Sequence, residues 1–363
     1  MGPIGPGEEN LMGTRSTVIG FAFLMLAVLC ATAQAAPTFT ITDIGTLGGS
    51  SSVGYGLNNA GTVVGTARIA NSSAWHAFRW ENGVIQDISG VYGESMGVNS
   101  AGHAAVSVSI DSNWRACVWA DGVLTDIGSL GGPDAWAGDI NDSDMVVGQS
   151  SLTSGAPHAF IWDGEMHDLG VLLGGSTSTA LGVNVYGDVA GWSTDEFDDQ
   201  HAVLWSAGEI YDLGYGIAEG VNALQQVVGW TNVGGRSLHG VVWEDGVRTD
   251  LGAFSATYNS YAYAINDMGW IVGMGNSNYG LRAALWQGGV LCDLNDLIPA
   301  GSGWQLRYAW DVNSNGQIVG FGLNPDGESH GFLLTPVAVP APGAIVLGMI
   351  GVAIVGVVRK RKS

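Results

Sequence analysis

Along residues 36–338, short apolar segments alternate with turns rich in asparagine, aspartate and glycine. Ala137–Asn141, Met145–Gly148, His158–Trp162 and Asp168–Gly170 are four such segments in succession, each with the length of a short β-strand and bounded by turn residues. In most copies an Asn-x-x-Gly turn, such as Asn58–Gly61, separates the first two segments. Both of these residue types tolerate the positive φ of a tight hairpin. The pattern therefore predicts antiparallel strands.

This four-segment unit recurs, and residues of four types mark equivalent positions in its copies. Aspartate followed by Leu or Ile ends the fourth segment at Asp43, Asp87, Asp126, Asp168, Asp212, Asp250 and Asp293, at intervals of 38 to 44 residues. Asparagine ends the first segment at Asn58, Asn99, Asn141, Asn184, Asn222, Asn266 and Asn313. Tryptophan ends the third segment at Trp80, Trp119, Trp162, Trp205, Trp243 and Trp286. Histidine begins the third segment at His76, His158, His201, His239 and His330. Four strands in roughly 40 residues match one blade of a β-propeller.

The two ends of the repeat array are complementary. Thr38–Gly45 is a fourth-type segment with no partners before it, and the array closes with a unit that lacks its fourth segment. That last unit consists of Trp310–Asn313, Gln317–Gly320 and His330–Leu334. Joining the two ends completes a blade and leaves no strand edge unpaired. The sequence predicts an all-β, seven-bladed β-propeller of four-stranded antiparallel blades, closed by the N-terminal strand 38–45. An open solenoid is the alternative, and it would not need complementary ends.

Composition supports a β-protein and narrows its partners. Glycine occupies 58 of 363 positions, which disfavours helices, while 46% hydrophobic residues and 14 tryptophans exclude disorder. Residues 36–338 hold seven arginines, no lysine and 31 of the 33 acidic residues, a net charge of 7 − 31 = −24. Such a surface repels phosphate backbones, so no nucleic-acid partner is expected. Cys117 and Cys292 lie too far apart in sequence to indicate a disulfide framework.

The N-terminus has the features of a secretory signal peptide. Val18–Ala31 is a nearly unbroken apolar run that follows Arg15 and precedes Ala33-Gln34-Ala35, a small-x-small cleavage pattern. Residues 1–35 are therefore predicted to be a signal peptide with a short helix, and the chain to be exported through the inner membrane. Translation could start at Met1 or at Met12.

The C-terminus, residues 339–363, has three parts. A Pro-rich hinge precedes the apolar residues 343–358, and Arg359–Lys362 form a basic end, which together predict a short membrane helix. This arrangement resembles the PEP-CTERM sorting signal of Gram-negative bacteria that export polysaccharide. The resemblance implies processing by an exosortase-type peptidase and a place in the cell envelope, at the surface or in the extracellular matrix. Ala341 stands where that signal has glutamate, so the tail is either cleaved or kept as an anchor.

The repeats themselves resemble a known family. Residues 43–67, DIGTLGGSSSVGYGLNNAGTVVGTA, and the HAFRW at residues 76–80 are similar to the HAF-family extracellular repeat of bacteria, and the likeness covers nearly all of residues 40–335. Two units depart from it, with Arg115-Ala116-Cys117 and Arg282-Ala283-Ala284 at the His-Ala-Phe position. The family has no established catalytic activity, so the resemblance implies the domain organisation more than a mechanism.

Repeated residues are interpreted as structural, because a catalytic group needs one asymmetric site. The chain contains no zinc-type His spacing, nucleophile elbow, P-loop or EF-hand loop. Function in repeat proteins is carried by what differs between copies. The loops from second to third strand and from blade to blade vary most, and they emerge on one face of the ring. We predict that this face contacts ligands through six aromatic residues, Trp75, Trp114, Trp136, Tyr258, Tyr261 and Tyr279.

One loop on this face is strongly acidic. Asp195, Glu196, Asp198 and Asp199 put four carboxylates within five residues, a set that could chelate calcium. The alternative is a solvated acidic loop in an acidic protein. The same residues could supply one carboxylate of a glycoside hydrolase pair, which requires a second carboxylate across a cleft. No other cofactor is expected.

Three functions fit the sequence. The first is a noncatalytic surface or matrix propeller, a binding or adhesion module for extracellular polysaccharide or another envelope component. The second is an extracellular glycan-active enzyme, a hydrolase or lyase, on the same ring. The third is a structural spacer without a specific ligand. An enzyme should bring acids with perturbed pKa values together in the central channel or a cleft, and a binding module should present aromatic residues without them.

Overall fold

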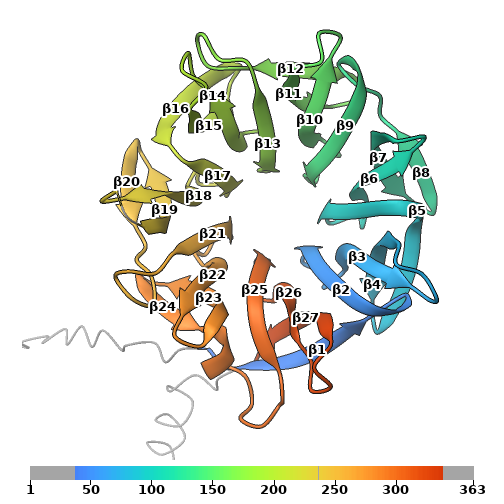
Figure 1. Ribbon diagram of the computed structural model, residues 1–363, viewed down its shortest axis with the longest axis vertical. Helices are drawn as coiled ribbons and strands as arrows, with labels where there is room; N and C mark the ends of the chain where they lie inside the picture. The colour runs from blue at the N-terminus through green and yellow to red at the C-terminus, as the bar shows by residue number, and fades with distance from the viewer. Residues whose placement is uncertain (1–36, 236, 338–363) are drawn as a thin grey trace, which may run out of the picture. The chain divides into compact units, whose positions relative to one another are not determined.

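The computed structural model describes residues 37–235 and 237–337, which form strands and a single turn of 3-10 helix, Leu294–Asp296. The strands form six antiparallel sheets, five of four strands and one of seven. The sheets stand around a central axis, with one edge strand of each facing the centre (Figure 1). This radial arrangement of antiparallel sheets is a β-propeller fold.

Each strand takes one of four places between the axis and the rim. The innermost strands are β2 (Gly48–Leu57), β5 (Val84–Val98), β9 (Gly131–Ile140), β13 (Ser178–Val183), β17 (Ile217–Val221), β21 (Ser260–Ile265) and β25 (Gln305–Val312). The second strands are β3 (Val63–Ile69), β6 (Ala104–Ile110), β10 (Val146–Leu152), β14 (Val189–Thr194), β18 (Val227–Val233), β22 (Ile271–Ser277) and β26 (Ile318–Leu323). The third strands are β4 (Trp75–Glu81), β7 (Asn113–Ala120), β11 (Pro157–Trp162), β15 (Gln200–Ser206), β19 (Ser237–Glu244), β23 (Gly280–Gln287) and β27 (Ser329–Pro336). The outer strands are β1 (Phe39–Gly45), β8 (Val123–Asp126), β12 (Met166–Gly170), β16 (Glu209–Tyr215), β20 (Val247–Asp250) and β24 (Val290–Asp293).

The seven-stranded sheet arises because β5 belongs to two groups of strands. Its first part pairs with β4 as an outer strand, and from Gly93 onward it pairs with β6 as an innermost strand. No loop interrupts it, whereas the equivalent crossing from β8 to β9 leaves the strand conformation after Asp126 and resumes it at Gly131.

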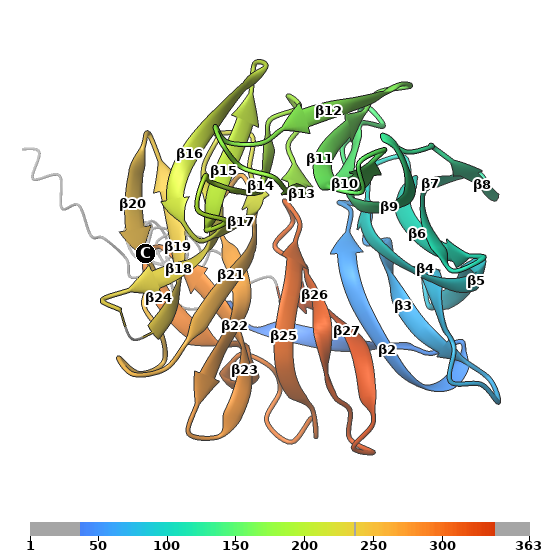
Figure 2. The same ribbon diagram turned by 45° about the horizontal axis from the view of Figure 1, so that its top comes forward.

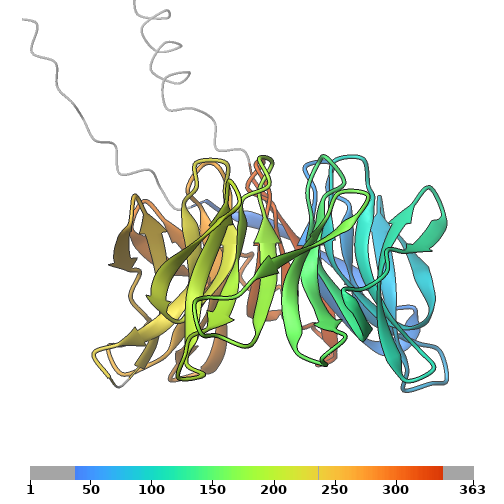
Figure 3. The ribbon, with the colours of Figure 1, turned by 90° about the horizontal axis from the view of Figure 1, so that it is seen from above.

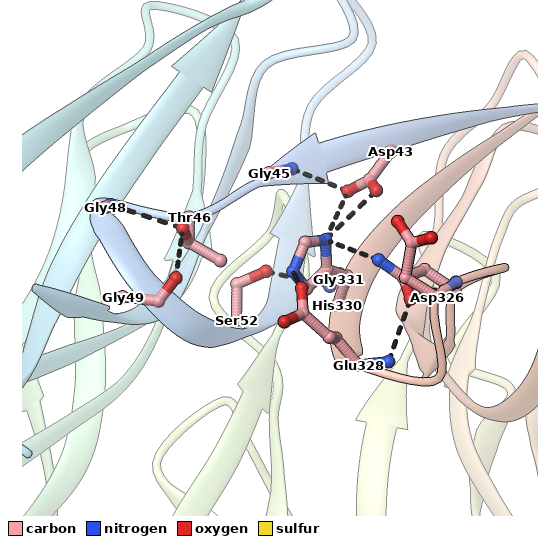
Figure 4. Close-up of polar contacts among 11 residues, drawn as sticks. Asp43, Gly45, Thr46, Gly48, Gly49, Ser52, Asp326, Glu328, His330 and Gly331 are labelled. Atoms are coloured by element: carbon pink, nitrogen blue, oxygen red, sulfur yellow. Dashed lines mark hydrogen bonds and ion pairs between the residues drawn. The ribbon is translucent and has the colours of Figure 1, made fainter. Parts of the chain in front are cut away.

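The first strand pairs with the last one, as the complementary ends of the array predict. β1 runs antiparallel to β27, from Phe39 opposite Pro336 to Gly45 opposite Gly331. The carboxylate of Asp43 accepts from Nδ1 of His330 at 2.9 Å, and the Gly331 amide donates to Oγ of Ser52 in the next sheet (Figure 4). The two ends of the described chain are thus joined within one sheet.

The repeated asparagines link neighbouring innermost strands by hydrogen bonds. In each copy Oδ1 accepts the amides two and four residues later, and Nδ2 donates to the backbone oxygen of the asparagine in the next copy. The Nδ2 bonds run from Asn58 to Asn99, Asn141, Asn184, Asn222, Asn266 and Asn313, and from Asn313 back to Asn58, over 2.8 to 3.2 Å. All seven side chains are at most 5% exposed. Three hydrogen bonds per copy thus explain the repeated asparagine as a structural residue.

The core lies between adjacent sheets rather than in one central mass. One cluster joins Val118 of β7 and Ala105 of β6 to Ile140, Val146 and Phe160 of the following sheet. Within each sheet, glycine seven residues after the asparagine lets the second strand approach the bulged innermost strand, because a Cβ at Gly148 would lie 1.9 Å from the Trp136 oxygen. Hairpins project at both ends of the strands and form two faces, seen edge-on in Figure 3.

Candidate functional site

The repeated histidines and aspartates satisfy each other. In five copies Nδ1 of the histidine on the third strand lies 2.6 to 3.0 Å from the aspartate of the outer strand. The pairs are His76–Asp87, His158–Asp168, His201–Asp212, His239–Asp250 and His330–Asp43. Each pair fastens an outer strand to its sheet, which explains why both residue types recur together.

The asymmetric site lies at the centre of the propeller, where sequence reasoning named no residue. Every innermost strand carries a β-bulge three residues before its asparagine, and the bulged residue lines a central cavity of about 290 Å³. The bulged residues are Tyr55, Met96, Gly138, Leu181, Glu219, Tyr263 and Trp310. Figure 2 shows the innermost strands β25 and β2 next to each other at this centre. A bulge redirects a side chain, so the backbone repeats while the chemistry differs from copy to copy.

Two aspartates in the cavity wall bridge neighbouring innermost strands. Asp139 accepts the Val183 amide at Oδ2 over 3.0 Å, and Asp311 accepts the Leu57 amide at Oδ2 over 2.8 Å. The Oδ1 atom of each accepts the amide of the following residue. Both carboxyl groups are therefore fixed in position, and each oxygen keeps a second lone pair.

Burial raises the pKa of the acidic groups around the centre. The pKa of Asp139 rises to about 7 and that of Glu219 to about 7, while that of Asp311 rises to about 6, mainly because the protein displaces water from them. Burial also raises the pKa of Glu94 on β5. Among residues 37–235 and 237–337, these four are the carboxyl groups with a raised pKa, and none of them is in an ion pair with a basic side chain.

Aromatic rings cover one side of the cavity. The Trp310 ring stacks on Tyr263 at 4.4 Å between centroids and meets Tyr55 edge-on at 5.5 Å. Burial raises the pKa of Tyr55 to about 12, so its hydroxyl stays protonated. The indole Nε1 of Trp310 is buried and has no hydrogen-bond partner among the described residues. The aromatic rings can stack on the flat apolar face of a ligand, and the buried carboxyl groups beside them can form hydrogen bonds with its hydroxyl groups.

The six aromatic residues predicted for the variable face fall into separate places. Trp114 and Trp136 lie together, 5.8 Å between centroids. Tyr261 stacks on Tyr263, so it connects this face with the cavity. Trp75 lies under the Arg68 guanidinium, while Tyr258 donates to Oδ1 of Asn278, and Tyr279 is 84% exposed. The structure thus brings Tyr261 to the central aromatic cluster and leaves the other five outside it.

The acidic loop does not form a cluster of ligands. Oδ1 of Asp195 accepts the amides of Phe197 and Asp199, and Oδ1 of Asp198 accepts the Ser176 hydroxyl. Within the part of the chain that the structure describes, no three His, Cys, Asp or Glu side chains are grouped to hold a metal ion. Calcium binding by Asp195, Glu196, Asp198 and Asp199 stays a prediction.

A signal in the sequence could have located the cavity. The position three residues before each asparagine is occupied by Tyr, Met, Gly, Leu, Glu, Tyr and Trp in the successive copies, more varied than either flanking position. Its neighbour on the N-terminal side is always small, as at Ala218 and Ala309. A variable residue that follows a small one at every copy fits a bulge that turns the variable side chain into a channel. The alternation of apolar and polar residues alone would instead place this side chain on a packed face of the sheet.

Comparison with known proteins supports the fold. No family model matches the chain, and no curated protein matches it in sequence. The β-propeller domain of the Trilobed protease from Pyrococcus furiosus is similar, with a TM-score of 0.52, 9% identity, and coverage of 80% of this chain and 98% of that one. TolB from Acinetobacter baumannii has a TM-score of 0.42 and 14% identity over 55% of this chain, which spans about half (52%) of TolB. The six-bladed Aleuria aurantia lectin, with fucose recognition, has a TM-score of 0.38 and 12% identity over 84% of this chain and 97% of the lectin.

The likeness to the Trilobed protease domain supports the class of protein that the fold defines, the β-propellers, and assigns no activity to the chain. The predicted signal peptide, residues 1–35, and the sorting tail, residues 339–363, lie outside the described residues. Within residues 37–235 and 237–337, no helix is long and apolar enough to cross a membrane.

Proposed function

We propose that the chain is an exported, noncatalytic β-propeller with seven blades in a closed ring, which binds a polysaccharide at its central cavity. The pairing of β1 with β27 supports closure, and so does the circle of asparagine hydrogen bonds that returns from Asn313 to Asn58. Counting β5 in both of its groups divides the seven-stranded sheet into two blades.

The observation that carries the binding proposal is the combination of rings and carboxyl groups in one cavity. Tyr55, Tyr263 and Trp310 offer aromatic faces that stack on the C–H face of a sugar. Asp139, Glu219 and Asp311 line the same space and bond hydroxyl groups. A cavity of about 290 Å³ suits a single sugar residue rather than a whole chain, since small-molecule sites begin at about 300 Å³. Tyr261 extends the aromatic surface toward the variable face.

A glycan array probed with the purified full-length chain tests this function. We expect binding to a subset of glycans that Trp310→Ala weakens at least tenfold, about 1.4 kcal/mol, since stacking on the half-buried ring is lost. Trp192→Ala is the matched control, because Trp192 is another half-buried tryptophan, on β14, that lies outside the cavity. Unchanged binding by Trp310→Ala would contradict the assignment of the site. If the chain bound no glycan at all, the remaining function would be the structural spacer without a specific ligand. Repeating the array with calcium tests the acidic loop.

A glycan-active enzyme is the second candidate, because acids with raised pKa values line the channel, as expected for an enzyme. It ranks second because backbone amides of the neighbouring innermost strands already engage Asp139 and Asp311. Glu219, with a pKa of about 7, holds a proton near neutral pH, as a general acid must. Product analysis of bound glycans distinguishes the two functions. Bond cleavage that Glu219→Gln abolishes while binding persists would establish the enzyme, whereas intact glycans support the binding module.

Export, the HAF-type repeat organisation and envelope attachment complete the proposal. The N-terminal apolar run with its Ala-Gln-Ala sequence supports signal cleavage before Ala36, and the basic tail supports sorting by an exosortase-type peptidase. Mass spectrometry of the chain recovered from an exporting host measures both ends. A mature chain that begins at Met1 or Met12 would contradict export by this signal.

A further inference from the structure

A second cavity lies apart from the channel, where β23 packs against β25. Its volume is about 250 Å³, and its lining consists of residues from the tip of the β22–β23 hairpin and the start of β25. These residues are Tyr279, Gly280, Leu281, Arg282, Gln305 and Arg307. The pocket therefore contains two of the seven arginines in residues 36–338 and no acidic residue.

The two guanidinium groups are poorly neutralised. Nε of Arg282 lies 3.7 Å from Oδ2 of Asp293, at the outer limit of an ion pair, and this buried Nε has no hydrogen-bond partner among the described residues. Oδ1 of Asp293 is already engaged by the backbone and side-chain nitrogens of Asn295. Arg307 takes part in none of the ion pairs found in residues 37–235 and 237–337. Arg282 thus has one carboxylate at a distance and Arg307 has none within ion-pair range among the described residues, and a buried guanidinium nitrogen without a partner is costly.

The Tyr279 ring lies within cation–π distance of one of these groups. The Cζ atom of Arg282 lies 5.5 Å from the centroid of the Tyr279 ring, a cation–π distance. The ring itself is 84% exposed at the hairpin tip. A guanidinium that stacks on an aromatic ring still directs its N–H groups outward in its plane, the geometry in which arginine binds a carboxylate through two hydrogen bonds.

Arg282 occupies a repeat position that is histidine in five copies and arginine in one other, at Arg115. In five copies this position is a histidine within 3.0 Å of the following aspartate. Arg282 contacts its aspartate, Asp293, only at 3.7 Å, so it replaces that fastening poorly. The departure from the repeat is accounted for if Arg282 serves a ligand.

We propose that Arg282, Arg307 and Tyr279 form a binding site for the carboxylate of an acidic sugar, such as a uronic acid unit of a polysaccharide. The inference rests on the proposed function in that the ligand is a glycan, and it names the class of glycan. With a net charge of −24 over residues 36–338, the protein repels polyanions over most of its surface. Two arginines in a pocket without acids supply the local attraction, while the exposed Tyr279 ring offers a surface for the sugar ring.

Calorimetric titration of the full chain with an oligogalacturonate tests the proposal. We expect Arg282→Gln and Arg307→Gln each to weaken binding about tenfold or more, since a charge-assisted hydrogen bond is lost. Arg248→Gln is the matched control, because it removes the same charge from an exposed position on β20 outside the pocket. Tyr279→Phe should retain affinity and Tyr279→Ala should lose part of it.

Sulfated and neutral dextrans complete the set of probes. Dextran sulfate that binds more tightly than oligogalacturonate, with loss in the same arginine variants, would overturn the carboxylate assignment in favour of a sulfate site. Equal losses of affinity in all three arginine variants, or no binding of oligogalacturonate by the wild-type chain, would refute the pocket as a binding site. Neutral glycans report on the channel instead, because their binding should respond to Trp310→Ala and not to Arg282→Gln. The two proposals therefore fail separately.

Discussion

The circle of asparagine hydrogen bonds predicts a large and graded loss of stability when one member is removed. Asn141 is 5% exposed and makes three bonds, from the amides of Ser143 and Met145 to Oδ1 and from Nδ2 to the Asn184 oxygen. Asn141→Ala removes all three and leaves the Asn184 oxygen and the Met145 amide without these partners. With about 1 kcal/mol for each lost bond, the free energy of unfolding should fall by about 3 kcal/mol.

Asn141→Ser separates the two roles of this side chain. A serine hydroxyl can accept a nearby amide, though more weakly than an asparagine oxygen, and it is too short to reach the next innermost strand. The free energy of unfolding of the serine variant should lie between those of the alanine variant and the wild type, about 1 to 2 kcal/mol below the wild type. The measurement is the urea midpoint followed by tryptophan fluorescence and by circular dichroism, with a shift in midpoint at constant slope.

Asn82→Ala provides the control. Asn82 is exposed in a turn with a φ of 50°, so alanine there costs only about 1 to 2 kcal/mol for the left-handed backbone. If Asn141→Ala were no more destabilising than Asn82→Ala, the three hydrogen bonds of Asn141 would contribute no more than the backbone strain of one exposed turn residue, and the reasoning would be refuted.

Two further changes test the centre and the core. Glu219→Gln should raise the free energy of unfolding at pH 8 and leave it unchanged at pH 4. The native carboxyl group keeps its proton up to a pKa of about 7, whereas the unfolded one loses it near 4.5, so wild-type stability falls as the pH rises between these values. The gain at pH 8 should approach about 3 kcal/mol, and denaturant titrations at both pH values would reveal a pH-independent difference if the assignment were wrong. Gly148→Ala should destabilise by about 1 to 3 kcal/mol, because its Cβ would lie 1.9 Å from the Trp136 oxygen. A melting temperature equal to that of the wild type would show that β9 can move aside.

Much of the fold follows from the sequence because it depends on residues that repeat. The recurring Asp, His, Asn and Trp positions predict four-strand units, and the unmatched Thr38–Gly45 segment predicts the pairing of β1 with β27. These residues act within one unit or on the next one, so their spacing contains the necessary information. The uninterrupted β5 could not be read in this way, because its turn-like Ser89-Gly90 sequence predicts a break between blades.

Most residues of the candidate site could not be predicted from the sequence pattern. Asp139, Glu219 and Asp311 come from three different sheets and line one cavity, Glu219 as a bulged residue and each aspartate directly after one. A strand pattern with period two does not reveal a bulge, so these acids look like ordinary surface residues in a very acidic chain. Only Tyr261 among the six predicted aromatic residues reaches the same cluster.

The continuous β5 couples the local unfolding of two repeat units. In a repeat protein each unit can open locally with its own free energy when flexible loops separate it from its neighbours. Because β5 hydrogen-bonds to β4 through its first part and to β6 through its second part, separating either group exposes the backbone of both. Amide protons from β3 to β7 should then exchange with solvent as one cooperative foldon, slower than those of β8 at the exposed rim.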